Sequence, residues 1–245
     1  MPKSDKDKAA KVEKAEKVDK AAKPDKGKAK KPTSPTIWPV DDHDLQRVIE
    51  GRHHDPHAIL GPHPYAGAVT VRTLRPWATS VVAVVAGPEG EMHVPLEHEH
   101  GGIFVGLIPV TEVPDYRLEV AYGGEPQTVD DPYRFLPTLG EMDLHLIGEG
   151  RHETLWTVLG AHEHTYRSAL GDVQGTSFAV WAPNAQGVRI VGDHNHWDGT
   201  GTPMRSLGSS GVWEVFVPGV GAGTRYKFAI LGRDGAELPF KADPM

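Results

Sequence analysis

The chain has 245 residues, no cysteine and a formal net charge of −7. It can form no disulfide, offers no thiolate to a metal, and has no apolar run near the roughly 20 residues that span a bilayer. Residues 1–32 hold 12 lysines against 6 acidic residues, so the rest of the chain is strongly acidic. We expect a cytoplasmic protein without a cofactor and without a membrane as partner. We also expect no nucleic-acid partner, because phosphate binding depends on clustered Lys and Arg and the chain after residue 32 is acidic.

Residues 1–36 form a lysine- and alanine-rich segment with almost no apolar side chain larger than alanine. Such a segment cannot bury a core, and we expect a disordered tail. Acidic residues interrupt its lysines throughout, which favours a solubilising tail over an arm that binds nucleic acid.

The next hundred residues predict one short helix followed by strands. Asp41 or Asp42 can cap a helix over residues 44–50, which Gly51 ends and whose apolar face should dock on the first sandwich. Short β-branched runs bounded by Gly and Pro predict strands. They cover residues 69–71, 81–85, 103–108 and 116–121.

The second half opens on a predicted helix over residues 141–147, with Met142, Leu144, His145 and Ile147 partly buried. Two strands, at 177–181 and 187–191, should pair with each other. The strands at 212–217 and 226–231 flank a glycine-rich segment, residues 218–224. That segment leads into a strand and not into a helix N-terminus, so we interpret it as a hairpin loop and not as a phosphate-binding loop.

The two halves repeat the same landmarks in the same order, with an offset that drifts from 99 to 112. A period of this length indicates two copies of a whole domain. We predict a mostly β chain of two tandem antiparallel immunoglobulin-like sandwiches of six to eight strands each, with short helical connectors. The predicted boundaries are 37–137 for the first sandwich, 138–158 for a helical linker and 159–245 for the second sandwich.

The densest group of polar and aromatic side chains follows the strand at 187–191. Trp197 there lies close in sequence to Asp193 and Asn195. Sugars combine apolar C–H faces with a rim of hydroxyls, and an aromatic face beside hydrogen-bonding groups suits them. The alternative is a tryptophan packed over the edge of the sandwich, with Asp193 and Asn195 bonded to the backbone of the turn.

Other polar clusters favour structural roles. The histidines around residues 53–57 and 93–100 have no spacing that supplies four zinc ligands, so we expect no metal site. The carboxylate pairs Asp41/Asp42 and Asp130/Asp131 are adjacent in sequence and point apart in an extended chain. They should cap and turn the backbone, not catalyse.

The second copy resembles the family-48 carbohydrate-binding module, which precedes the barrel of glycogen branching enzymes and their debranching relatives. The segments 178–185, 191–199, 211–219 and 226–228 carry this resemblance. The first copy resembles the extra N-terminal module of bacterial 1,4-α-glucan branching enzymes. The segments 54–61, 71–76 and 130–135 carry it, with 149–152 and 159–162 at the junction.

This resemblance implies an accessory region of an enzyme that transfers α-1,4-glucan segments to form α-1,6 branches. The catalytic carboxylates belong to a barrel, and none of its motifs occurs before Met245, so we assign no catalytic residue and expect this chain alone to be inactive. The partners implied are an α-glucan and the barrel of the same full-length chain. Alternatives are a free-standing glucan-binding adaptor, or the N-terminus of a debranching or trehalose-forming relative.

The resemblance also implies the glucan-binding residues, which are Trp197, Asn195, Asp193 and Lys227. Two departures weaken the expected site. His194 replaces the usual phenylalanine, and the position of a second tryptophan falls near Arg233 and Asp234. A single stacking residue suggests millimolar affinity, about 4 kcal/mol. The first copy has no aromatic in its loop at residues 86–90, and we expect it to be a structural spacer.

Overall fold

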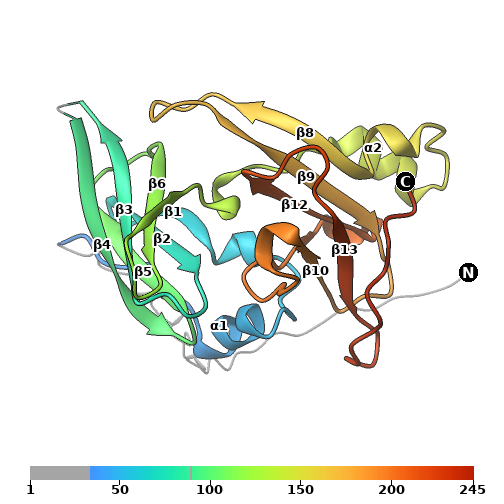
Figure 1. Cartoon of the computed structure of the whole chain (residues 1–245), viewed down its shortest axis with the longest axis horizontal. Helices are drawn as coiled ribbons and strands as arrows, with labels where there is room; N and C mark the ends of the chain where they lie inside the picture. Colours follow the sequence, from blue (N-terminus) through green and yellow to red (C-terminus); the bar gives the residue numbers. More distant parts are fainter. Residues whose placement is uncertain (1–33, 89) are drawn as a thin grey trace, which may run out of the picture. The chain divides into compact units, whose positions relative to one another are not determined.

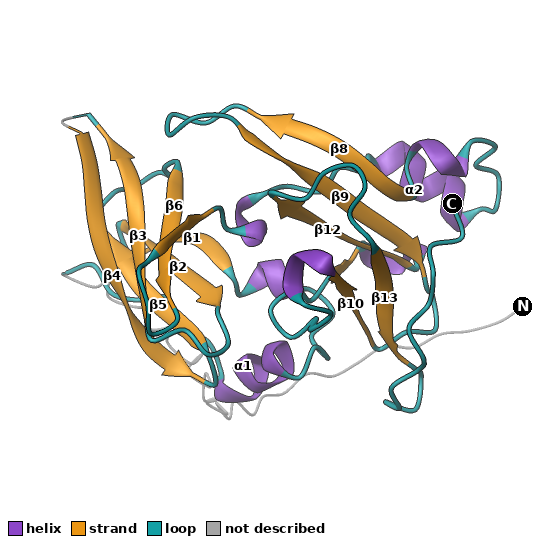
Figure 2. Ribbon diagram, in the orientation of Figure 1, coloured by secondary structure: helices purple, strands orange, loops and turns teal. Residues whose placement is uncertain are grey.

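The computed structural model describes residues 34–88 and 90–245, and Pro32–Met245 forms one compact unit. The predicted tail therefore lies almost entirely outside the described residues. In the described part every paired strand runs antiparallel and the α-helices are short, which confirms the predicted mostly β fold (Figure 2). No helix among these residues has the length and apolar character needed to cross a membrane.

The first seven strands form one continuous sheet that folds into two layers, here called module 1 (Figure 1). They are β1 (Gly61–Tyr65), β2 (Ala68–Leu74), β3 (Ser80–Gly87), β4 (Gly90–His100), β5 (Ile103–Ile108), β6 (Tyr116–Ala121) and β7 (Gln127–Val129), in the order β1-β2-β5-β4-β3-β6-β7. The long strand β4 joins the layers, because its first part pairs with β3 and its last part, from Glu97 to His100, pairs with β5 with a register shift between His98 and His100. Alternating apolar side chains of both layers fill the core between them.

The remaining strands form module 2, in two separate sheets. They are β8 (Gly160–Tyr166), β9 (Val173–Trp181), β10 (Gly187–Gly192), β11 (Arg205–Ser206), β12 (Val212–Pro218) and β13 (Tyr226–Leu231), ordered β11-β12-β9-β8 and β10-β13.

Two predictions for module 2 are wrong. The opening strands β9 and β10 do not pair with each other, because they lie in different sheets. Residues 218–224 are not a hairpin loop, because they connect β12 in one sheet to β13 in the other. Val220 in this connection is buried in the core, and its carbonyl accepts a hydrogen bond from Thr176 Oγ1 at 2.7 Å.

The predicted duplication is confirmed down to the strand register. The pairs β1–β2, β2–β5 and β3–β6 of module 1 correspond to β8–β9, β9–β12 and β10–β13 of module 2. Equivalent partners are Gly61–Arg72 and Gly160–Ala179, Thr73–Phe104 and Val180–Trp213, and Val81–Val120 and Val188–Ile230. Even a side-chain bond recurs, since Tyr116 donates its hydroxyl to Asp131 and Tyr226 donates to Asp243.

The two helices take part in the same duplication. Helix α1 (Asp42–Ile49) has the predicted cap, Asp41, whose carboxylate accepts from His43 N at 2.8 Å, although the helix begins two residues earlier than predicted. Helix α2 (Glu141–Gly148) begins 99 residues later. The short turns Pro56–Ala58 and Leu155–Thr157 are again 99 residues apart.

Each helix packs on the start of its own module. Leu45 and Val48 of α1 lie in one apolar cluster with Leu60 and Ile103, and the equivalent Leu144 and Ile147 of α2 pack on the cluster that contains Leu159 and Val212. Residues 140–158 thus repeat the opening of module 1, although the domain boundary at 158 remains a prediction. Met142 and His145 are exposed and not partly buried, because α2 presents only one face to the module.

A single segment, residues 131–135, closes module 1 and enters module 2. Asp131 is fully buried and accepts from Tyr116 Oη at 2.7 Å and from Tyr133 N at 3.3 Å, so it serves as the predicted cap. Phe135 then packs on Phe216 of β12, with ring centroids 4.7 Å apart. Its carbonyl accepts from Arg205 at 3.1 Å, and Arg205 is paired at 2.7 Å with the buried Glu214.

A second contact between the modules is made largely by backbone atoms, with the Arg189 side chain donating to Ile49 O at 3.3 Å. Ser206 N donates to His54 O at 2.7 Å. Gly187, at the start of β10, approaches Gly51 so closely that a Cβ added to Gly187 would lie 1.9 Å from the Gly51 carbonyl oxygen. Neither side of this contact can yield without moving one module away from the other.

Replacing Gly187 by alanine tests this close approach. Overpacking of this kind costs about 1–3 kcal/mol, so we expect Gly187→Ala to lower the free energy of unfolding by about 2 kcal/mol, measured by urea denaturation. Gly124→Ala is the matched control, because an added Cβ there meets nothing within 4 Å. Equal stability of the two variants would contradict the close contact.

His57 lies in the short turn Pro56–Ala58, beside the segment that closes module 1. Its ring meets the ring of Tyr133 edge to face at a centroid distance of 5.0 Å. Both ring nitrogens are shielded from solvent and make no hydrogen bond. Burial, with a smaller effect of the Arg205 charge, lowers the pKa of His57 well below its usual value, so the native state holds this imidazole neutral.

The neutral His57, whose ring nitrogens are shielded from solvent, should make stability depend on pH. A group whose pKa is lower in the folded state binds fewer protons there, so acidification below the unfolded-state pKa of about 6.5 favours unfolding. We expect His57→Leu to reduce the loss of unfolding free energy between pH 7 and pH 5, by up to about 1.4 kcal/mol per pH unit. Replacing the exposed His43 by leucine is the control. An unchanged pH slope in His57→Leu would contradict a neutral His57.

Candidate functional site

The candidate site lies where the two copies differ. In module 1, β3 turns directly into β4 through the pair Gly87–Gly90. In module 2, β10 ends at Gly192 and the chain makes an irregular loop, residues 193–204, before β11. We call this segment the Trp197 loop. It contains three of the four predicted site residues.

Asn195 holds the base of the Trp197 loop. Its Oδ1 accepts from Gly192 N at 2.9 Å, and its Nδ2 donates to Ile190 O at 2.9 Å and to Thr202 Oγ1 at 3.1 Å. Both N–H groups of the Asn195 amide are thus used as donors, and its oxygen already accepts one hydrogen bond. Asn195 therefore shapes the loop and has little capacity left for a ligand.

Asp193 fixes the orientation of the tryptophan. Its carboxylate accepts from Trp197 Nε1 at 3.2 Å and from Arg225 Nε at 2.9 Å. The hydrogen bond from Arg225, with a further one from Trp197, lowers the pKa of Asp193. The carboxylate is thus charged at neutral pH and holds the indole edge, so that the ring face is left for contact.

The backbone of the Trp197 loop is strained at His196 and Trp197. His196 and Trp197 both adopt positive φ angles, 54° and 63°, a region that residues other than glycine rarely occupy. Such conformations cost of order 1–3 kcal/mol each and persist only where the surroundings enforce them. Here the hydrogen bonds of Asn195 and Asp193 enforce them.

Trp197 lines a cavity of about 220 Å³ on the outer face of β10 and β13. Alternate residues of these strands point outward there, because Ile190 and Phe228 point into the core. The cavity is lined by the outward residues Arg189, Val191, Ala229 and Leu231, by Trp197–Thr200 of the loop, and by Ile230, Glu237, Leu238 and Phe240.

The four predicted site residues therefore take different positions relative to the cavity. Trp197 lines the cavity, whereas Asp193 and Asn195 support it from within the loop. Lys227 is exposed and lies outside the lining, but it pairs in register with Val191, which is part of the lining. Whether any of these side chains touches a sugar remains a prediction.

Phe240 is an aromatic residue of the cavity that was not predicted from the sequence. It is 48% exposed and lines the cavity together with Trp197. The predicted position of a second aromatic, near Arg233 and Asp234, belongs instead to a separate hollow. The internal repeat could have predicted this position. Val129 pairs with Leu118 in module 1, and the equivalent Lys241 forms a bridge with Phe228 in module 2. Residues 237–241 therefore lie beside β13.

His194 occupies an aromatic position of the core. Its ring lies nearly parallel to that of Phe178, at a centroid distance of 6.3 Å and an angle of 13°. Neither ring nitrogen has a hydrogen-bond partner, and burial lowers the pKa of His194. A neutral imidazole thus fills the space where the family pattern has phenylalanine.

The histidine clusters form no recognisable metal centre. Within residues 34–88 and 90–245, no group of three His, Asp or Glu side chains is arranged to hold a metal ion. His53 and His54 stack on each other at 5.0 Å, and His57 is shielded against Tyr133. Their contacts are those of structural residues.

Comparison with known proteins gives family matches over both modules. Residues 41–133 match the N-terminal domain of the α-1,4-glucan branching enzyme GlgB, and residues 158–245 match carbohydrate-binding module 48, the isoamylase N-terminal domain. The pullulanase type I of Bacillus subtilis str. 168 complexed with maltose has 18% identity over 75% of this chain and 24% of that chain, with a TM-score of 0.26. This likeness is too weak to carry an argument.

The similar curated proteins are branching enzymes of much greater length. 1,4-alpha-glucan branching enzyme GlgB 1 of Streptomyces coelicolor is 57% identical over 84% of this chain and 25% of its own length. The GlgB of Thermobifida fusca is 60% identical over 74% of this chain and 24% of its own length. The chain thus spans about a quarter of the length of these relatives, and it consists largely of a GlgB-type N-terminal domain followed by a carbohydrate-binding module 48.

Proposed function

We propose that this chain is the non-catalytic glucan-contacting region of a cytoplasmic 1,4-α-glucan branching enzyme. The complete enzyme would move α-1,4-glucan segments onto 6-hydroxyls during glycogen synthesis, with its chemistry in a barrel outside residues 1–245. The family matches of both modules and the chain's coverage of about a quarter of the GlgB relatives support this assignment. In it, module 2 contacts the polysaccharide, and both modules pack on the catalytic barrel.

The observation that carries the glucan contact is the cavity beside Trp197. Two aromatic residues, Trp197 and Phe240, line it together with the charged residues Arg189, Asp198 and Glu237. This combination matches a sugar ring, whose C–H faces pack on aromatic carbons while its hydroxyls bond to the polar rim. Because Asp193 already holds the indole, the sugar would not have to order it on binding.

The size of the cavity predicts a weak site. Its volume of about 220 Å³ is below the range of about 300–1,000 Å³ that encloses a drug-sized ligand. It would therefore hold a short part of a glucan chain and not enclose an oligosaccharide. Millimolar affinity, about 4 kcal/mol, is sufficient on a polymer that offers many equivalent chain ends. Lys227, beside Val191, would contact a chain leaving the cavity.

Removing the aromatic rings should weaken glucan binding. We expect Trp197→Ala to raise the Kd for maltoheptaose about tenfold, a loss of about 1.4 kcal/mol, and Phe240→Ala to raise it severalfold. Lys227→Ala should have a smaller effect, because Lys227 lies outside the lining. Isothermal titration calorimetry, or affinity electrophoresis in gels containing glycogen, gives these values.

Trp77→Ala is the matched control, because Trp77 is 85% exposed and belongs to module 1. It should leave the affinity unchanged. Loss of binding in Trp77→Ala with full binding in Trp197→Ala would place the glucan contact elsewhere. No binding by the unaltered chain, at any maltoheptaose concentration up to tens of millimolar, would contradict the proposal itself.

The chain by itself should not turn over glucan. Retaining glucan chemistry needs two carboxyl groups about 5–5.5 Å apart across the scissile bond, and the family supplies them from its barrel. We expect amylose incubated with this chain to gain no α-1,6 linkages and no reducing ends, measured by proton NMR. New linkages or hydrolysis would contradict the assignment of the chemistry to another part of the enzyme.

A further inference from the structure

We propose that a glucan chain bound beside Trp197 continues into a polar groove between the two modules, at the end of α1. We call this hollow the Arg52 groove. It has a volume of about 520 Å³ and is lined by Glu50, Arg52, Arg189, Leu231, Gly235 and Glu237. The inference rests on the proposed function, because it lengthens the site beside Trp197 and adds a part of module 1 to it.

The Arg52 groove adjoins the Trp197 cavity. Arg189, Leu231 and Glu237 line both hollows, so these three residues form a shared wall. The rest of the groove belongs to two different parts of the fold. Glu50 and Arg52 follow α1 of module 1, whereas the shared wall belongs to module 2. A ligand that leaves the cavity on this side therefore touches both modules.

The strand register gives the direction of this path. The outward pairs of β10 and β13 follow one another as Val191–Lys227, Arg189–Ala229 and Gly187–Leu231. Lys227 thus lies at one end of the face that bears the Trp197 cavity. The last pair lies at the other end, where Gly187 packs closely on Gly51. A chain that runs along the strands from Lys227 past Trp197 therefore reaches the end of α1 next.

Arg52 extends from module 1 over this face of module 2. Its guanidinium lies beside the turn at Gly235, where an added Cβ would be 3.6 Å from Arg52 Nη1. The ion pair between Arg52 Nε and Glu50 Oε2 is 3.7 Å long, which exceeds hydrogen-bond length, and both side chains are nearly half exposed. An arginine carries five N–H donors, and this loose pair leaves them available to a ligand.

The repeat provides a direct comparison. Arg52 and Glu50 correspond to Arg151 and Glu149, which follow α2 and lie 99 residues later. There Arg151 Nη1 donates to Glu149 Oε2 at 3.1 Å, and the arginine side chain is 74% exposed. The arginine of module 2 is thus bonded to its own turn, whereas the arginine of module 1 lies against the neighbouring module.

The charges of the Arg52 groove favour a neutral ligand that carries hydroxyls. Two arginines and two glutamates, Arg52, Arg189, Glu50 and Glu237, make up most of its lining, and their charges sum to zero. A sugar hydroxyl both donates and accepts, so neighbouring hydroxyls can bond to a guanidinium and a carboxylate together. A phosphate or another anion would meet both carboxylates at close range, and they would repel it.

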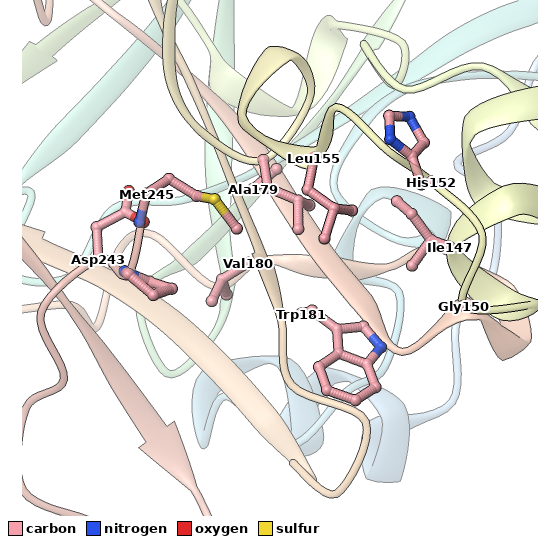
Figure 3. Close-up of a pocket in the computed structure, with 11 residues that line it drawn as sticks. Ile147, Gly150, His152, Leu155, Ala179, Val180, Trp181, Asp243 and Met245 are labelled. Atoms are coloured by element: carbon pink, nitrogen blue, oxygen red, sulfur yellow. The ribbon is translucent and has the colours of Figure 1, made fainter.

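The hollow beside Trp181 lacks this chemistry. Its volume is about 280 Å³, and Figure 3 shows Ile147, Leu155 and Met245 directed toward its common space. The polar groups at its border, Trp181 Nε1 and the His152 ring, are already hydrogen-bonded within the fold. A glucan would find few partners for its hydroxyls there. The Arg52 groove, which offers charged groups and adjoins the Trp197 cavity, is the better continuation.

Sugars of different length test the proposal on the 245-residue chain by NMR titration. We expect the Kd to fall about tenfold from maltotriose to maltoheptaose, because only the longer sugar reaches the Arg52 groove. Arg52→Ala should raise the Kd for maltoheptaose about fivefold and leave the Kd for maltotriose unchanged. Arg151→Ala is the matched control and should change neither value. The amide signals of residues 50–52 and 235–237 should shift with maltoheptaose and not with maltotriose.

Equal Kd values for the two sugars in the unaltered chain would overturn the proposal, and so would equal effects of Arg52→Ala and Arg151→Ala. An equal rise of both Kd values in Arg52→Ala would also contradict it, because Arg52 would then support the fold and not the longer sugar. Shifts at residues 50–52 that inorganic phosphate causes and maltoheptaose does not would make the groove an anion site. Failure of the proposed function looks different, because then neither sugar binds at all.

Discussion

The rest of the structure depends on the buried segment that runs from Asp131 to Phe135. Asp131 ties this segment to the core of module 1 through Tyr116, and Phe135 ties it to the core of module 2 through Phe216. Burial raises the pKa of Asp131, partly offset by the positive charge of Arg75 and by the hydrogen bond from Tyr116. Between these two anchors Tyr133 reaches the Trp197 loop, so module 1 supports from behind the loop that we propose for glucan contact.

The duplication explains where function could arise. Each module keeps the same helix, the same three strand pairs and the same tyrosine–aspartate bond, and these shared parts account for folding. The copies differ after β3 and β10, where module 1 continues into a hairpin and module 2 makes the Trp197 loop. The proposed glucan contact lies at this difference.

Much of the fold could be predicted from the sequence, because β-branched runs, turn residues and the repeat are local or periodic signals. The sheet partners could not, since pairing joins distant segments, and β9 and β10 were wrongly expected to pair. For the site, the sequence correctly indicated the Trp197 loop as the candidate. Asn195 and Asp193 were predicted to contact the ligand, but their hydrogen bonds are made within the loop and to its flanking strand. Phe240 escaped notice because it reaches the cavity only through its bridge beside β13.

The central claim is that modules 1 and 2 form one body that holds the Trp197 loop in place. Differential scanning calorimetry of the unaltered chain tests it most directly, because two domains joined only by a linker unfold independently. The account predicts one endotherm whose calorimetric and van't Hoff enthalpies agree. Two resolved endotherms, each with the enthalpy expected for a single module, would contradict it.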